Sequence, residues 1–122
     1  MSGTFLSFKE MCSKFDVTPR TLRYYEYIEL LTPQKQGRNR LYGTREQARM
    51  TLILRGRRFG FSLEVIRRFL LIYEEEGTQA QLQAWVEIAT DQLKELRHQQ
   101  DELSATIDEL EGMRQDAIKR LG

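Results

Sequence analysis

The feature that most constrains the fold of this chain is a long apolar repeat near its C-terminus. Apolar residues recur there on alternating steps of three and four, and they are Leu82, Val86, Ala89, Leu93, Leu96, Leu103, Ile107, Leu110, Ala117 and Leu121. Gln100 and Arg114 occupy the two steps at which the repeat is polar. The repeat contains no proline, so its spacing predicts one helix from about Thr78 to about Arg120, roughly 60 Å long. Thr78 with Gln81 predicts a capping box at the start of this helix.

A narrow apolar stripe of this length has to be covered, and the rest of the chain contains no second long helix to cover it. We therefore expect the partner to be another copy of the chain. The residues expected at this dimer interface are Leu82, Val86, Leu93, Leu96, Gln100, Leu103, Ile107 and Leu110. A buried polar side chain at Gln100 would fix the register or the size of the oligomer, whereas Arg114 has an equal alternative as a solvated defect near a frayed end.

The charges divide unevenly along the chain, although the net charge is only +1. Residues 1–73 hold 14 Lys and Arg against 6 Asp and Glu, which gives +8, and residues 74–122 hold 5 against 12, which gives −7. This asymmetry indicates a basic module that meets a polyanion, joined to an acidic segment with another role. Two ordinarily solvated surfaces would also explain it, and charge alone does not decide between the two.

Several classes of protein are excluded by what the sequence lacks. One cysteine and one histidine provide neither an internal disulfide nor a Cys/His zinc site, so we expect no metal. No His/Asp/Ser set, glycine-rich phosphate loop or carboxylate pair can be assembled, so we expect neither an enzyme nor a cofactor. The longest apolar run, residues 69–73, is too short to cross a bilayer, and the first residues form no secretory signal, so we expect a cytoplasmic protein.

The basic half is predicted to begin with two short helices. A helix face that packs on a core is indicated by the spacing of Phe8, Met11, Cys12 and Phe15. Thr18 followed by Pro19 provides an N-cap and a first-turn proline, which indicate the start of a second helix. Two helices separated by so few residues suggest a helix-turn-helix.

The next stretch contains too many turn formers for a helix. Residues 32–43 suit a short two-stranded ribbon that turns at residues 37–39. Lys35, Arg38 and Arg40 cluster around that turn. A basic ribbon beside a helix-turn-helix is placed to grip a neighbouring DNA backbone or a minor groove.

Two further helices are predicted before the long one. Thr44 and Gln47 predict a capping box that opens the third helix, and Gly60 ends it. Ser62 is expected to cap a fourth helix that runs to about Tyr73. These boundaries divide the chain into a basic domain at residues 1–76 and a long helix at residues 77–122.

The second predicted helix has two faces of different chemistry. At about 100° per residue, one face gathers Arg20, Arg23, Tyr24 and Tyr27. The opposite face holds Leu22, Tyr25 and Ile28. A helix fits the major groove of B-DNA, where arginine bonds to guanine edges and tyrosine reaches phosphates or thymine methyl groups. For this helix alone, a solvated face whose aromatic rings cover a loop is an equal alternative.

Four stretches of the basic half form a specific combination. They are residues 18–26 (TPRTLRYYE), 30–31 (LL), 39–42 (NRLY) and 58–64 (RFGFSLE). In this combination the chain resembles the MerR-type winged helix-turn-helix transcription regulators over about residues 6–73. The resemblance implies a mainly α fold, with a winged helix-turn-helix head of about four helices and a two-stranded wing. It also implies that the long helix forms an antiparallel coiled coil with a second subunit.

The resemblance further implies which residues meet double-stranded DNA. Arg20, Thr21 and Tyr24 would approach base edges or adjacent phosphates. Arg23 and Tyr24 would anchor the backbone, and Arg40 with Tyr42 would clamp phosphates from the wing. The full expected set is Thr18, Arg20, Thr21, Arg23, Tyr24, Arg38, Arg40 and Tyr42.

The sequence departs from the family pattern at two positions. Glu29 stands where the family usually has a glycine that ends the recognition helix, and Asn39 stands where the wing often carries tyrosine or glycine. A left-handed conformation at Glu29 would cost roughly 1 kcal/mol.

The implied function is a homodimeric regulator that reads the halves of an inverted repeat in a promoter, distorts the spacer and so changes contact with RNA polymerase. Residues 52–63 (LILRGRRFGFSL) are most similar to the branch that regulates leucine and isovalerate utilisation, which would place the targets in branched-chain amino acid or acyl catabolism. The sequence identifies no small-molecule effector. The alternative is a coiled-coil adaptor, or a protein that binds DNA without sequence preference, with a basic head and no regulatory ligand.

Overall fold

The computed structural model describes residues 5–74 and 78–122. The chain separates into two compact units, Met1–Thr78 and Gln79–Gly122, which we call the head and the rod. The boundary expected between residues 76 and 77 lies outside the described residues.

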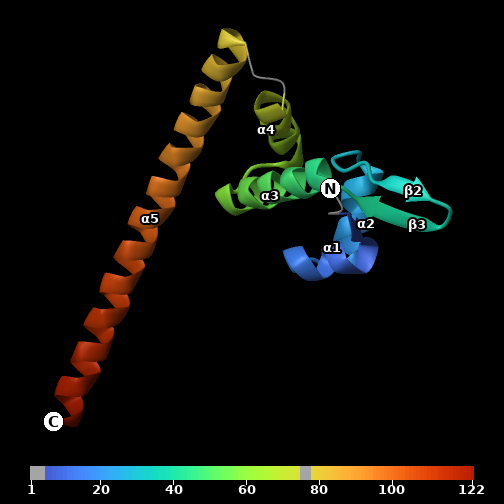
Figure 1. The fold of residues 1–122 in the computed structure, drawn as a ribbon. Coiled ribbons are helices and arrows are strands. Elements are labelled where there is room, and N and C mark those ends of the chain that lie inside the picture. Colours follow the sequence, from blue (N-terminus) through green and yellow to red (C-terminus); the bar gives the residue numbers. More distant parts are fainter. Residues whose placement is uncertain (1–4, 75–77) are drawn as a thin grey trace. The chain divides into compact units, whose positions relative to one another are not determined.

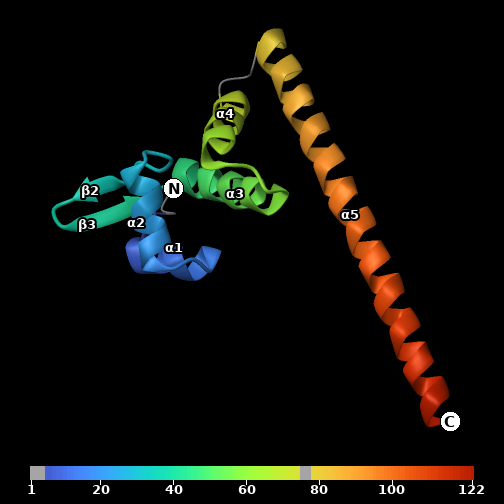
Figure 2. The ribbon, with the colours of Figure 1, turned by 180° about the vertical axis from the view of Figure 1, so that it is seen from behind.

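The described residues of the head form four helices and three short strands. In chain order these are β1 (Leu6–Ser7), α1 (Phe8–Phe15), α2 (Pro19–Tyr27), β2 (Gln34–Gln36), β3 (Asn39–Tyr42), α3 (Thr44–Phe59) and α4 (Leu63–Glu74). In Figures 1 and 2, β2 and β3 project together from the helices as a ribbon, the wing. A mainly helical head that carries a wing is the fold that the sequence predicts.

The sheet has one strand more than the predicted ribbon. Its strand order is β1-β3-β2, and both pairs are antiparallel. Leu6 pairs with Tyr42, and Lys35 pairs with Arg40. The prediction of two strands was therefore incomplete, because β1 has only two residues and so short a strand shows no alternation of apolar and polar positions.

The first two helices begin at side-chain caps. Ser7 Oγ accepts a hydrogen bond from the backbone N–H of Glu10 at 3.1 Å, and Glu10 Oε1 accepts one from the backbone N–H of Ser7 at 2.8 Å. This capping box starts α1. Thr18 Oγ1 accepts a hydrogen bond from the backbone N–H of Thr21 at 3.1 Å, and Pro19 occupies the first turn of α2, as predicted.

The start of α3 differs from the prediction. Gly43 is the N-cap, and it provides no side-chain hydrogen bond. Thr44 is therefore the first helical residue. A capping box needs its threonine at the N-cap, one residue earlier, so Thr44 and Gln47 cannot form one. The side-chain Nε2 of Gln47 instead donates to the carbonyl oxygen of Tyr42 at 3.0 Å. The predicted capping box at Thr44 is wrong for this reason.

The later caps agree with the prediction. Gly60 has a φ of 89°, a left-handed conformation that glycine adopts without strain, and it ends α3. Ser62 Oγ then accepts a hydrogen bond from the backbone N–H of Val65 at 3.2 Å at the start of α4.

All four helices of the head contribute to its core. The fully buried large side chains are Tyr42, Phe69, Met11, Leu22, Leu30, Leu31, Met50, Ile53, Ile66 and Leu70. The helices α3 and α4 approach closely at Gly56, where a Cβ atom would lie only 2.8 Å from Cγ1 of Ile66. This packing fixes α2 with its apolar face inward and leaves its other face for solvent.

The rod is one helix, α5 (Gln79–Leu121), of 43 residues. The single long helix that the apolar repeat predicts is confirmed, and Figures 1 and 2 show it without interruption. The large apolar side chains of the repeat are exposed, from 37% at Leu96 to 88% at Leu121. No helix in the described ranges is long and apolar enough to cross a membrane.

Candidate nucleic-acid interface

The two faces of α2 are the ones that the sequence predicts. Leu22 is fully buried and Tyr25 is 6% exposed, whereas Tyr24 is 48% and Tyr27 is 83% exposed. Arg20 is also exposed on α2. The helix therefore packs through its apolar side and presents cations and aromatic rings to solvent.

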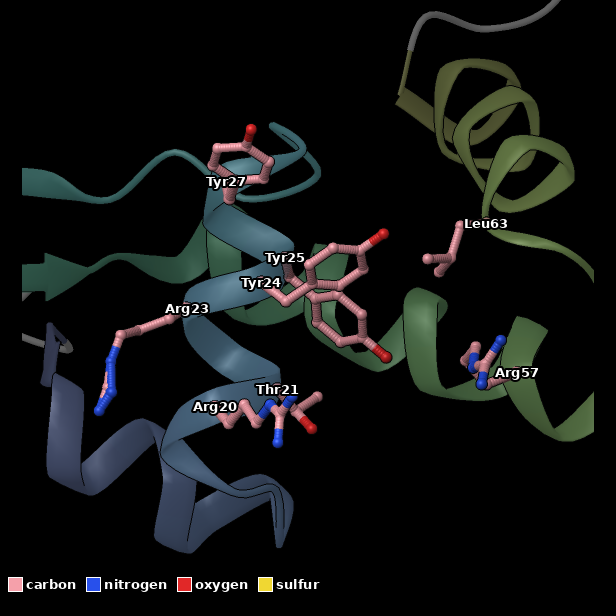
Figure 3. Close-up of a pocket in the computed structure, with 8 residues that line it drawn as sticks. All are labelled: Arg20, Thr21, Arg23, Tyr24, Tyr25, Tyr27, Arg57 and Leu63. Atoms are coloured by element: carbon pink, nitrogen blue, oxygen red, sulfur yellow. The ribbon is translucent and has the colours of Figure 1, made fainter.

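An open hollow of about 590 Å³ lies along this exposed face. Figure 3 shows α2 on one side of it and, on the other side, Arg57 from α3 and Leu63 at the start of α4. Its remaining lining residues, all from α2, are Arg20, Thr21, Arg23, Tyr24, Tyr25 and Tyr27. Its walls carry cations and hydroxyl groups, which suits an extended polyanion that runs across the surface.

Sequence reasoning did not place Arg57 and Leu63 beside α2. Arg57 counted only toward the general positive charge of the basic half, and Leu63 carried no signal for binding. Both positions come from the packing of α3 and α4 against the rest of the head, and no spacing along the chain reports that packing.

Two of the predicted DNA-binding arginines share one aromatic ring. The guanidinium carbon of Arg23 lies 5.5 Å from the centroid of the Phe8 ring, and that of Arg40 lies 5.4 Å from it. In Figure 3 the Arg23 side chain extends from α2 toward α1. Cation–π attraction to Phe8 therefore holds together one arginine from α2 and one from β3.

Glu26 links α2 to the wing. Its Oε1 atom lies 2.9 Å from Nε of Arg40, an ion pair in which the Nε–H is not aligned for a hydrogen bond. Its Oε2 atom accepts a hydrogen bond from the hydroxyl of Tyr42. Burial and this bond to a carboxylate raise the pKa of the Tyr42 hydroxyl well above its ordinary value, so Tyr42 stays a neutral donor.

The structure places Tyr42 differently from the prediction. Its side chain is fully buried and its hydroxyl is bonded to Glu26, so it cannot clamp a phosphate directly. The Arg40 side chain, by contrast, remains 37% exposed. Tyr42 therefore acts on the wing surface only through the carboxylate that it shares with Arg40.

The other predicted residues lie at the edges of this surface. Thr18 Oγ1 donates a hydrogen bond to Thr21 Oγ1 at 3.0 Å, which adds to its role as the cap of α2. Arg38 is exposed at the turn of the wing, directly after Gly37, which has a φ of 63°. The structure thus brings the α2 residues together on one face and holds Arg38 on the separate wing turn.

Three arginines of the basic half are bonded to the protein itself. Arg49 Nε donates to the carbonyl oxygen of Leu30 at 2.8 Å, and Arg67 Nη2 donates to that of Ile28 at 2.6 Å. Arg45 pairs with the buried carboxylate of Glu46 at 2.8 Å. The positive charge of the head is therefore only partly a surface for ligands.

Glu29 adopts the left-handed conformation that its place at the end of α2 demands. Its φ is 63°, and a non-glycine residue pays about 1 kcal/mol or more for it. The chain thus keeps the turn that the family makes with glycine, at a cost in strain.

The one cysteine of the chain belongs to α1 and not to the exposed face of α2. Cys12 is half-buried on α1, and burial raises the pKa of its thiol. In the part of the chain that the structure describes, no three His, Cys, Asp or Glu side chains gather as a metal ligand set.

These features define the class of the head. Two adjacent short helices, a β wing and a solvent-facing second helix make a winged helix-turn-helix, and its exposed α2 face suits the grooves and phosphates of DNA.

Comparisons with known proteins agree with this class. Two family models match the chain, one described as "MerR HTH family regulatory protein" at residues 6–71 and one described as "MerR, DNA binding" at residues 47–113. The chain is 31% identical over 107 residues to an HTH-type transcriptional regulator of Pseudomonas aeruginosa, a match that covers 85% of this chain and 79% of that protein. It is 38% identical over 65 residues to the HTH-type transcriptional regulator ZntR of Escherichia coli, covering 52% of this chain and 46% of ZntR.

Solved structures give the same result. A MerR family transcriptional regulator from Bacillus cereus matches with a TM-score of 0.73 at 25% identity, covering 89% of this chain and 79% of that one. HiNmlR, a MerR family regulator lacking the sensor domain and bound to promoter DNA, matches with a TM-score of 0.64 at 22% identity. This match covers 86% of this chain and 80% of the HiNmlR chain. The likeness to HiNmlR shows the fold alone.

The chain belongs to the MerR family of helix-turn-helix regulatory proteins. It is a DNA-binding transcriptional regulator of that family.

Proposed function

We propose that this regulator acts as a homodimer on an inverted-repeat operator within a promoter. The observation that carries the proposal is the exposed apolar repeat of the rod, in which eight large side chains are at least 37% exposed. Complete burial of one such side chain is worth about 1.5–3 kcal/mol, so an apolar stripe of this length favours association. A second copy offers a stripe of the same length and spacing.

An antiparallel arrangement suits the polar positions of the repeat. When two rods overlap along the whole repeat, opposed residues have numbers that add up to 203, as Leu82 and Leu121 do. Arg114 then lies opposite the partner's Ala89. A small side chain at that position leaves room for the arginine stem to run along the interface toward water.

The same overlap brings the polar residue Gln100 to the centre of the pair. Gln100 is the middle residue of α5, and it lies opposite the partner's Leu103. Its counterpart, the partner's Gln100, occupies the adjacent layer across the two-fold axis. Two amides that bond to each other there favour this register over the one in which opposed numbers add up to 210, where the two Gln100 side chains are too far apart to bond.

On DNA, we assign base reading to the exposed face of the recognition helix. Arg20 and Tyr24 approach base edges, with Thr21 at the adjacent backbone. Phosphate contacts come from Thr18 and Arg23 on α2, and from Arg38 and Arg40 on the wing. Arg57 adds a further cation from α3 across the hollow.

Two likenesses support the proposed site of action and the proposed target genes. The structure of HiNmlR is that of a regulator bound to promoter DNA, which supports a promoter operator for this chain too. Distortion of the spacer between promoter elements would then change contact with RNA polymerase. The similarity of residues 52–63 to the leucine and isovalerate branch supports targets in branched-chain amino acid or acyl catabolism.

Two measurements test the proposal. DNA fragments that the purified protein retains from its own genome are sequenced, and the recovered inverted repeat is compared with a scrambled duplex in salt titrations. We expect at least about 10³-fold tighter binding to the repeat, with fragments lying beside genes of branched-chain catabolism. Equal affinity for both duplexes would establish the alternative of binding without sequence preference. Sedimentation as a single chain at concentrations that bind DNA would exclude the homodimer.

A further inference from the structure

The segment that follows α2, the proposed recognition helix, is bonded to two arginines, one from α3 and one from α4. The helix ends at Tyr27, and residues 28–33 lead from it to the wing. Arg67 on α4 bonds to the carbonyl oxygen of Ile28 at 2.6 Å, and Arg49 on α3 bonds to that of Leu30 at 2.8 Å. Ile28 is the C-cap of α2, where the helix dipole places partial negative charge and where cations are favoured, and Leu30 follows two residues later.

Further bonds fix the same segment. The backbone N–H of Thr32 donates to Oε1 of the buried Glu46 at 2.7 Å, again from α3. The backbone N–H groups of Leu30 and Leu31 donate to the carbonyl oxygen of Tyr25 at 2.9 and 3.3 Å. Ile28, Leu30 and Thr32 are thus each bonded to a side chain of α3 or α4, in the segment that directly follows α2 in the chain.

We infer that Arg49 and Arg67 are positioning residues that set the pose of the recognition helix, so that sequence discrimination depends on two arginines that bind protein carbonyls instead of DNA. The inference rests on the proposed reading of bases by α2. Base recognition by Arg20 needs alignment within a fraction of an ångström, whereas long cations on the wing follow a phosphate through small displacements. A loosened α2 therefore loses discrimination before it loses affinity for any duplex.

The experiment uses the full chain with Arg49→Met and Arg67→Met, which remove both the donor and the charge. Arg55→Met and Arg68→Met are the matched controls, because they remove an exposed arginine from the same two helices. Affinities for the operator and for a scrambled duplex are measured across a range of salt. Hydrogen exchange at the amides of Leu30 and Leu31 is measured on the protein without DNA.

We expect each test variant to lower the ratio of operator to scrambled affinity about tenfold, the effect of one charged hydrogen bond. The amides of Leu30 and Leu31 should exchange faster in the same variants, by about the same factor. The two controls should keep the wild-type ratio and exchange rates. Arg67→Lys, which keeps a cationic donor, should recover most of the ratio.

Three results would overturn the inference. A phosphate contact would lower affinity for both duplexes equally and reduce the salt slope by about 0.9, with exchange unchanged. A purely structural role would lower the melting temperature and leave the ratio at its wild-type value. If the methionine variants do not fold, Arg67→Gln replaces them. A wild-type ratio of operator to scrambled affinity in Arg67→Gln, with wild-type exchange at Leu30 and Leu31, would then overturn the inference. Because the exchange measurement needs no DNA, it stands even if no specific operator is found.

Discussion

At the scale of single residues, the proposed DNA contact assigns different tasks to Arg20 and Arg40. Arg20 is exposed on the recognition helix, whereas Arg40 lies on the wing beside Glu26 and Phe8. Arg20→Ala should lower discrimination by about 1–3 kcal/mol at one base pair of the operator. Arg40→Ala should weaken binding to every duplex and reduce the salt slope by about 0.9. Competition binding against single-base operator variants, repeated at several salt concentrations, measures both effects; equal behaviour of the two variants would refute this division.

Glu29 offers a test of backbone strain. Its φ of 63° disfavours any side chain, so Glu29→Gly should raise the free energy of unfolding by about 0.5–1 kcal/mol, after the extra freedom of glycine in the unfolded chain is counted. Asp16→Gly is the matched control, since Asp16 has a φ of 54° but aspartate tolerates this conformation better. Denaturant unfolding should therefore show a smaller gain for Asp16→Gly. A larger gain at residue 16 would contradict the argument.

At the scale of elements, the hydroxyl of Tyr42 joins the wing to α2. Tyr42→Phe removes the hydrogen bond to Glu26 and should cost about 1.5–3 kcal/mol of stability. The pKa of Tyr42 is raised in the folded state, so above about pH 10 the unfolded chain releases this proton first. The contribution of Tyr42 to the free energy of unfolding should be fully present below about pH 10 and should fall as the pH rises beyond it. Thermal melts from pH 8 to 11 should show a shallower fall for Tyr42→Phe; parallel curves would exclude this contribution.

The elements also show how far local sequence patterns reach. The Thr18 cap with Pro19 predicted α2, whereas periodicity predicted α1 and α5, because an apolar face repeats along each of them. Periodicity did not predict β1, whose two residues are strand only because they pair with β3. The capping-box motif failed at Thr44, because the start of α3 depends on the conformation of Gly43. The exposed face of α2 could be predicted from spacing. The burial of Tyr42 and the position of Arg57 beside α2 could not, because they depend on packing between distant segments. The same is true of the bonds from Arg49 and Arg67 to backbone carbonyls.

The orientation of two rods can be tested by cysteine crosslinking. In an antiparallel pair, residue 93 lies opposite residue 110, since these numbers add up to 203. In a Cys12→Ser background, Leu93→Cys and Leu110→Cys should each form little disulfide alone and crosslink when the two chains are mixed. Strong self-crosslinking of either variant alone would indicate parallel rods. The pair Leu93→Cys and Leu103→Cys is the control, because those positions are not opposed in this register.

At the scale of the whole molecule, the proposed homodimer predicts the distance between the two halves of the operator from the length of the rod. In the proposed antiparallel pair, where opposed residue numbers add up to 203, the N-terminal ends of the two α5 helices lie about 68 Å apart. Two heads on one face of B-DNA need a whole number of turns between half-site centres, and each turn spans about 34–36 Å. Two turns come closest to the separation of these rod ends, so the proposed dimer favours half-sites two turns apart.

Operators with half-site centres about 10, 15, 20 and 25 base pairs apart should therefore bind most tightly at about 20. The 15-base-pair operator turns the second half-site to the opposite face of the duplex, so it should bind no better than a single half-site. Tightest binding at about 10 base pairs would contradict this prediction of the half-site spacing. Because half-site sequences stay constant across the series, any difference in affinity reports the geometry of the dimer alone.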